Sequence, residues 1–282
     1  MVIIGLKSGR LANRLFAFSH FIGNAIEYNY RLLNPTFSEY CKYFPSTRND
    51  DFGGYQISTK KSYVYPLLLV LVPLLRQCRN SSLHHFLENH DELNPFDLND
   101  EEFLKQAREK MTVAYGWNFR DRKNFEKHAE TIRKCFGLAS PYDENVEYRI
   151  DDCRRETDIL IGVHIRRGDY KGWRGGIYYY DDSVYYDKML QAKGHFGGGG
   201  KRVSFLLVSD EKINKNNFEG LDINLGTNHF VEDLYSLSRC DYIIGPPSTY
   251  SMWASFYGKV PALEITSAKQ AIDVKCFTVA SG

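Results

Sequence analysis

The residues most able to do chemistry stand at 161–170, where the sequence reads IGVHIRRGDY. An apolar run stops there on two adjacent arginines. A guanidinium is a planar, permanently charged fork that binds two oxygens of a phosphate at once. We therefore predict an anion site, in which one of Arg166 and Arg167 binds phosphate and the other pairs with Asp169. A purely structural ion pair is the alternative.

Two more polar clusters follow apolar runs. They read SDE at 209–211 and GPPSTYS at 245–251. Ser248 or Thr249 is placed to cap a helix, and the free amides of a helix start attract anions such as a diphosphate. Ordinary helix capping is the alternative explanation for these hydroxyl residues.

The opening stretch LKSGRLANRLF is a third candidate. Its glycine turn follows a short apolar strand at 1–7, and Arg10 and Asn13 stand where the turn meets a helix predicted over 8–30. The stretch lacks the G-x-G-x-x-G pattern, so a dinucleotide fingerprint is absent. A structural turn is the alternative reading.

The elements that must position these residues are clearest in the C-terminal half. Strands are predicted at 159–165, 202–210, 241–245 and 260–265, and helices within 178–193, 229–240 and 248–258. Unbroken apolar strands alternating with helices are typical of a parallel sheet covered on both faces. Ligands of such sheets bind beyond the carboxyl ends of the strands, so the polar clusters should converge.

The N-terminal half gives weaker signals. A helix is predicted over 99–110 with Asn99 as its cap, but the fold of residues 31–140 is left open. The apolar run 63–75 is too short to span a bilayer and contains two prolines. We predict a core helix there. The alternative is a patch that docks on a membrane or an amphiphilic acceptor, because the basic RQCR follows.

Composition excludes several classes. A net charge of +1 predicts no general attraction to nucleic acid. The six cysteines include no C-x-x-C pair, which argues against a zinc knuckle. The chain does not open on a secretory signal pattern, so we expect a cytoplasmic protein, with the inner face of a membrane as the alternative site.

Four motifs, VHIRRGDY, FLLVSDE, EDLYSLSRCDYIIGPPSTYSMWA and GRLANRLF, resemble those of the α-1,2-fucosyltransferase family. More broadly, they resemble the superfamily that includes the α-1,6- and protein O-fucosyltransferases. The resemblance implies an α/β GT-B architecture of two Rossmann-like lobes. Residues 1–150 would form the acceptor-side lobe and residues 151–282 the nucleotide-sugar lobe, a parallel sheet covered by helices.

The implied reaction is the inverting transfer of L-fucose from GDP-β-L-fucose to a hydroxyl of a glycan or glycolipid. It implies no cofactor and no metal, which fits the absence of a D-x-D at the strand ends. Arginine and helix amides would then neutralise the departing diphosphate. The resemblance does not imply a particular acceptor, linkage or oligomeric state.

The resemblance also assigns roles. Arg166 would hold the β-phosphate, His164 would contact guanine, and Asp210 would accept hydrogen bonds from guanine or ribose. The phosphates would be lined by Ser248, Thr249 and Ser251. Arg10 and Asn13 would reach the sugar and the acceptor from the first lobe, while Arg167 and Asp169 would support the loop.

This sequence departs from the family pattern in two places. The opening motif differs at Arg10, Ala12 and Arg14, and no glutamate follows the arginine motif. The general base is therefore open: Asp181 or Asp182 could serve, and a loose transition state could need little assistance from a base. Two other functions stay open: the same fold with a different nucleotide sugar, and a catalytically idle protein that binds nucleotide or glycan.

Overall fold

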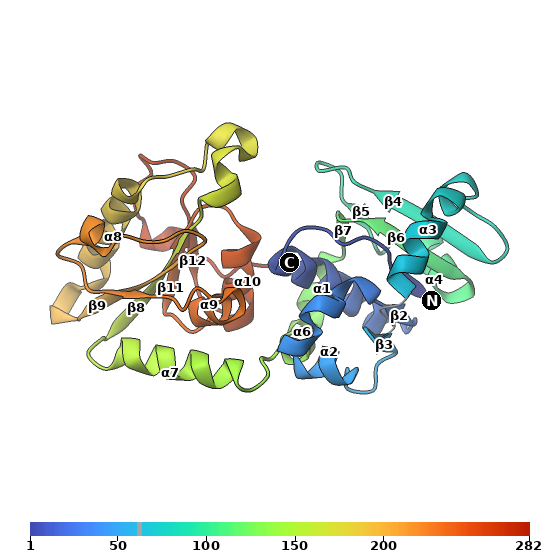
Figure 1. Ribbon diagram of the computed structural model, residues 1–282, viewed down its shortest axis with the longest axis horizontal. Helices are drawn as coiled ribbons and strands as arrows, with labels where there is room; N and C mark the ends of the chain where they lie inside the picture. The colour runs from blue at the N-terminus through green and yellow to red at the C-terminus, as the bar shows by residue number, and fades with distance from the viewer. Residues whose placement is uncertain (61–63) are drawn as a thin grey trace. The chain divides into compact units, whose positions relative to one another are not determined.

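The computed structural model describes residues 1–60 and 64–282 (Figure 1). Tyr63, the first residue of the apolar run, lies outside the described residues. The chain divides into two compact units, Met1–Ala139 together with Gly282, and Ser140–Ser281.

Unit 1 is built on a parallel five-stranded sheet in the order β3-β2-β1-β6-β4. These strands are β3 Ile57–Ser58, β2 Leu32–Leu33, β1 Val2–Ile4, β6 Met111–Gly116 and β4 His84–Asn89. A second small sheet pairs β5 Phe96–Asp97 with β7 Phe119–Arg120. The helices are α1 Leu11–Tyr28, η1 Pro35–Tyr43, α2 Pro45–Asn49, α3 Val64–Gln77, α4 Glu101–Glu109, α5 Arg122–Lys127 and α6 Ala129–Cys135.

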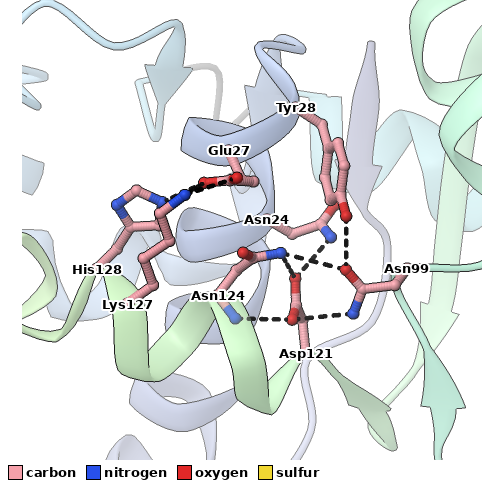
Figure 2. Close-up of polar contacts among 8 residues, drawn as sticks. All are labelled: Asn24, Glu27, Tyr28, Asn99, Asp121, Asn124, Lys127 and His128. Atoms are coloured by element: carbon pink, nitrogen blue, oxygen red, sulfur yellow. Dashed lines mark hydrogen bonds and ion pairs between the residues drawn. The ribbon is translucent and has the colours of Figure 1, made fainter.

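A buried polar network ties α1 to α5 (Figure 2). The Asp121 carboxylate is 1% exposed and accepts hydrogen bonds from the side-chain amides of Asn24, Asn99 and Asn124, at 2.7, 3.0 and 2.7 Å. It also caps α5 by accepting from the Asn124 backbone N–H at 2.9 Å. Because a buried carboxylate is costly unless its oxygens are bonded, this network specifies how the β7–α5 turn meets α1.

Helix α3 is only partly a core helix. Leu68, Val72 and Leu75 pack on one face of the sheet, whereas Val70 and Leu74 are 74% and 62% exposed. The predicted core helix therefore buries one side and leaves the other apolar side open. Among the described residues, no helix combines the length and apolarity needed to cross a membrane.

Unit 2 holds a second parallel five-stranded sheet, in the order β10-β9-β8-β11-β12. The strands are β10 Ile223–Leu225, β9 Val203–Ser209, β8 Ile159–Ile165, β11 Tyr242–Gly245 and β12 Ala262–Glu264. The helices are α7 Tyr142–Arg154, α8 Asp182–Phe196, α9 Phe230–Leu237 and α10 Thr249–Gly258, with short turns η2 Gly168–Lys171, η3 Trp173–Gly176, η4 Gly198–Gly200, η5 Lys215–Phe218 and η6 Val274–Cys276.

Helices cover both faces of this sheet. On one face α8 packs Tyr185 and Met189 against β8 and β9. On the other face α9 approaches β8 closely at Gly162, where a Cβ would lie 2.6 Å from the Leu237 side chain. With both faces covered, the carboxyl ends of the strands are left as the place for a ligand.

The segment around the boundary expected after residue 150 is polar and forms α7, Tyr142–Arg154. The boundary expected at 150 falls inside this helix, and the units separate after Ala139. Helix α7 belongs to unit 2 because it packs on α9 and is fixed to it by an Asn145–Glu232 hydrogen bond of 2.8 Å.

Candidate active site

The central strand β8 delivers the arginine pair to the carboxyl edge of the sheet. It is hydrogen-bonded to β9 on one side and to β11 on the other, and it ends at Ile165. Arg166 and Arg167 follow the last strand residue, and the chain turns at once into η2. Because the strand has ended, the two arginines are not forced onto opposite faces.

Arg166 is held by two carboxylates. Its guanidinium forms ion pairs with Asp169 and Asp210, and it lies 5.4 Å from the centre of the Tyr170 ring. The predicted pairing of Arg167 with Asp169 is therefore wrong. The turn after Arg167 brings Asp169 back under Arg166 instead.

Arg167 belongs to a different group. It pairs with Asp182, and its Nε donates to the Tyr180 carbonyl at 3.1 Å, which ties the end of β8 to the start of α8. The Asn217 amide also donates to Asp182. An open pocket of about 510 Å³ lies on this side, with Arg167, Asp182 and Tyr186 among its lining residues.

The two aspartates considered as general base both have structural partners. Asp181 caps α8 by accepting from the Val184 N–H at 3.2 Å, and a hydrogen bond from the Ser183 hydroxyl lowers the pKa of its carboxyl. Asp182 is engaged by Arg167. A lowered pKa and an existing ion pair both weaken a carboxylate as a proton acceptor.

Asp210 joins the ends of two strands. Besides pairing with Arg166, its carboxylate accepts the Arg167 backbone N–H at 2.9 Å. Gly168 permits this approach, because a Cβ there would lie 2.6 Å from an Asp210 carboxylate oxygen. The predicted contact of Asp210 with guanine or ribose stays a prediction.

His164 is a buried histidine behind the arginines. It is 3% exposed and its ring centre lies 4.9 Å from that of Tyr250. Burial, and then the positive charge of Arg166, lower the pKa of His164 to about 3, so the ring is neutral at pH 7. Within the described part of the chain its buried Nδ1 atom has no hydrogen-bond partner.

The third cluster forms the start of α10. Ser248 is the N-cap, and its side chain accepts from the Tyr250 N–H at 3.2 Å. Ser251 is buried and donates to the Ser248 carbonyl at 3.2 Å. Thr249 is the first helical residue. The structure thus brings these three residues to the same sheet edge as His164, and Ser248 also serves as an ordinary helix cap.

Arg10 and Asn13 lie in unit 1, at the start of α1. Arg10 is the N-cap residue, exposed and without a side-chain capping bond. Gly9 adopts φ +63°, and a Cβ there would lie 2.1 Å from the Asn13 side-chain nitrogen. Their reach to sugar or acceptor stays a prediction.

Two residues near this edge of the sheet were not predicted from the sequence. Tyr170 stacks under Arg166 and donates from its hydroxyl to the Pro247 carbonyl, so it links the arginine turn to the start of α10. Asp233 is a buried carboxylate that accepts from the Thr227 N–H at 2.7 Å, and burial raises its pKa. The sequence could have indicated Asp233, because it is an acidic residue within the apolar helical pattern at 229–240.

The described residues contain no group of three or more His, Cys, Asp or Glu side chains arranged to hold a metal ion.

Comparison with known proteins identifies this architecture. The family model described as glycosyl transferase family 11 matches residues 116–271, more than half of the chain. No curated protein sequence matches.

Several solved structures are similar. Arabidopsis thaliana FUT1, a mutant in complex with GDP, has a TM-score of 0.64 and 12% identity over 94% of this chain and 72% of its own. The fucosyltransferase NodZ from Bradyrhizobium has a TM-score of 0.61 and 14% identity over 98% and 96%. POFUT1 in complex with GDP-fucose has a TM-score of 0.56 and 12% identity over 96% and 95%. At these identities the likeness shows the fold, and the predicted α/β GT-B class is confirmed.

Proposed function

The chain belongs to glycosyl transferase family 11 and is a glycosyltransferase, as its motifs predict, and from this premise we propose that it transfers L-fucose from GDP-β-L-fucose. The acceptor is a hydroxyl of a glycan or glycolipid, and the anomeric carbon is inverted. Structures similar to this one contain GDP or GDP-fucose, which supports the choice of donor.

The observation that carries the proposal is the environment of Arg166. Its side chain, 13% exposed, directly follows the central strand, and two carboxylates hold its guanidinium in place. A fork held in this way is preorganised for phosphate oxygens, which need only replace one carboxylate. As the sugar–oxygen bond breaks, negative charge builds on the β-phosphate, and Arg166 stabilises it without a metal.

The neighbouring residues complete the donor site. The neutral ring of His164 contacts guanine, and the amides at the start of α10 face the diphosphate with the hydroxyls of Ser248, Thr249 and Ser251. In this proposal Arg10 and Asn13 act from the acceptor-side lobe.

Thermal denaturation with GDP, UDP, ADP and TDP, each with and without EDTA, tests the donor and the metal. GDP should raise the melting temperature most, and EDTA should leave that shift unchanged. A larger shift with UDP would assign another donor, and loss of the GDP shift in EDTA would overturn the metal-free mechanism. Release of fucose from GDP-fucose separates an active enzyme from an idle binding protein.

We also propose that the exposed side of α3 docks on an anionic bilayer. No acidic residue occurs between Asp51 and Glu88, while lysines and arginines flank the helix, so the segment complements anionic headgroups. The apolar side chains of Leu67, Val70 and Leu74 would enter the interface.

Sedimentation with phosphatidylcholine vesicles, with and without phosphatidylglycerol, tests this docking. Wild type should sediment with the anionic vesicles only, and the variant Val70→Asp/Leu74→Asp should not sediment. Leu93→Asp changes an exposed leucine in a different loop and should behave as wild type. Equal sedimentation of wild type and the α3 variant, or a concentration-dependent dimer that the variant abolishes, would exclude a bilayer as the occupant.

A further inference from the structure

Glu264 ends the edge strand β12 beside the proposed donor site. It pairs in register with Gly245 of β11, and Gly245 lies against His164, since a Cβ at 245 would come within 3.0 Å of the His164 Cβ. His164, Gly245 and Glu264 are therefore neighbours across three parallel strands, at the edge where the ligand is expected.

The side chain of Glu264 lies on the α10 face of the sheet. Its chain neighbours Leu263 and Ile265 belong to the core beneath α8, and successive strand residues point to opposite faces. Helix α10 contacts both β11 and β12 on the other face. Glu264 is thus on the same side of the sheet as the helix start that is proposed to bind phosphate.

Tyr170 connects Glu264 electrostatically to the arginine site. Burial raises the pKa of the Tyr170 hydroxyl, the negative charges of Asp169 and Glu264 raise it further, and Ser248 and Arg166 lower it. The Glu264 charge therefore acts on a hydroxyl that also contacts the start of α10, in agreement with the strand register that places Glu264 at this edge.

Glu264 is also an uncommitted carboxylate. Among the described residues, no hydrogen bond or ion pair engages its side-chain oxygens, in contrast to Asp169, Asp181, Asp182 and Asp210. The residue is solvent-accessible, and partial burial raises the pKa of its carboxyl above the usual value for glutamate. Both properties suit a proton acceptor.

We propose that Glu264 is the general base of the transfer, an inference that rests on the proposed function. The acceptor hydroxyl gives its proton to the Glu264 carboxylate as its oxygen bonds to the anomeric carbon of fucose. The bond from that carbon to the β-phosphate oxygen breaks, and its electron pair leaves with GDP. The protonated carboxyl then returns its proton to water.

Two nucleophiles test the role without knowledge of the natural acceptor. Water must lose a proton when it attacks GDP-fucose, whereas azide attacks as an anion and needs no base. In Glu264→Gln, GDP-fucose hydrolysis should fall by about 10²-fold or more, the typical share of a general base. The rate of fucosyl azide formation and the affinity for GDP should stay at the wild-type values.

The matched control is Glu156→Gln, at the amino end of β8, where an exposed glutamate pairs with Arg202 at 3.0 Å. This control should leave both rates unchanged. Unchanged hydrolysis in Glu264→Gln would overturn the inference, as would equal losses of hydrolysis and azide transfer or weakened GDP binding. Wild type that neither binds GDP nor consumes GDP-fucose would instead refute the proposed function.

Discussion

Arg166 and Arg167 are adjacent in sequence but belong to separate groups of ion pairs. Arg166 contacts Asp169 and Asp210 at the sheet edge, and Arg167 contacts Asp182 at the start of α8. Substituting each arginine by lysine keeps the charge and removes the fork, so the pair of variants separates transition-state stabilisation from loop support.

Arg166→Lys should lower turnover of GDP-fucose by about 10²–10³-fold, the usual effect of removing one preorganised donor. Lysine is a point charge and cannot bond two phosphate oxygens in the same plane. The affinity for GDP should change less than turnover, because the lost contact strengthens as charge builds on the β-phosphate. Turnover kinetics and GDP titration measure the two effects.

Arg167→Lys should instead keep turnover and lower the melting temperature, because it loses the 3.1 Å hydrogen bond to the Tyr180 carbonyl. Reversed phenotypes would mean that the two roles are exchanged. If both variants turned over like wild type, arginine stabilisation of the leaving GDP would be wrong.

The arginine motif was identifiable from sequence, but its partners were not. An apolar run that stops on charged residues marks a strand end, and this position is confirmed at Ile165. Asp169 is near both arginines in sequence, so only the turn geometry decides between them. Asp210 was expected at the same sheet edge because it also follows an apolar strand, but its ion pair with Arg166 was not. The positions of Asp182 and Glu264 depend on tertiary structure, and no local pattern links them to the motif.

At the scale of elements, the helices and strands that carry a long apolar pattern could be predicted from the sequence. In unit 2 the strands β8, β9, β11 and β12 and the helices α8, α9 and α10 were expected, because each is an unbroken apolar run or has a helical period. The three-residue β10 and the polar helix α7 were not expected. Strands β2 and β3 have two residues each, too few for any period. The helix expected over 99–110 is α4, but Asp100 caps it and not Asn99. Both residue types cap well, and Asn99 bonds to Asp121 instead.

The network around Asp121 gives an element-scale prediction. Asp121→Ala should destabilise the protein by about 3 kcal/mol or more, because it removes the cap of α5 and takes away one of the two acceptors of the buried side-chain amides of Asn24 and Asn124. Urea unfolding followed by circular dichroism measures the loss.

Glu27→Gln is the matched control in the same region (Figure 2). Glu27 forms ion pairs with Lys127 and His128 at 2.7 and 3.0 Å, but these pairs are open to solvent, where screening weakens them. The Glu27→Gln variant should therefore have a free energy of unfolding close to that of wild type. Equal destabilisation by the two substitutions would show that burial of the Asp121 network does not matter.

At the scale of the whole molecule, the described residues of each unit contain one buried histidine. Burial is the main cause that lowers the pKa of His20 in unit 1 and of His164 in unit 2 to about 3. In the unfolded chain both titrate near 6.5. Between these values the unfolded chain binds the additional protons, so acid favours unfolding.

The contribution of the two histidines to the free energy of unfolding should therefore be constant above about pH 7 and fall as the pH drops from 6.5 towards 3. Each histidine contributes a slope of up to about 1.4 kcal/mol per pH unit. Urea unfolding at pH 7 and pH 5 tests this, since most carboxylates titrate below that window. The double variant His20→Gln/His164→Gln should show a flatter profile, and an unchanged slope would contradict the assignment.

The strand order of unit 2 predicts that the phosphate-binding residue and the proposed general base differ in their resistance to local unfolding. Arg166 follows β8, which is central and paired on both sides, whereas Glu264 ends β12, a three-residue strand at the edge. Edge strands open by local fluctuations long before the sheet unfolds as a whole. Urea below the unfolding transition should therefore slow the hydrolysis of GDP-fucose first, while azide transfer and GDP binding persist. Parallel loss of all three would mean that β12 opens only with the entire unit.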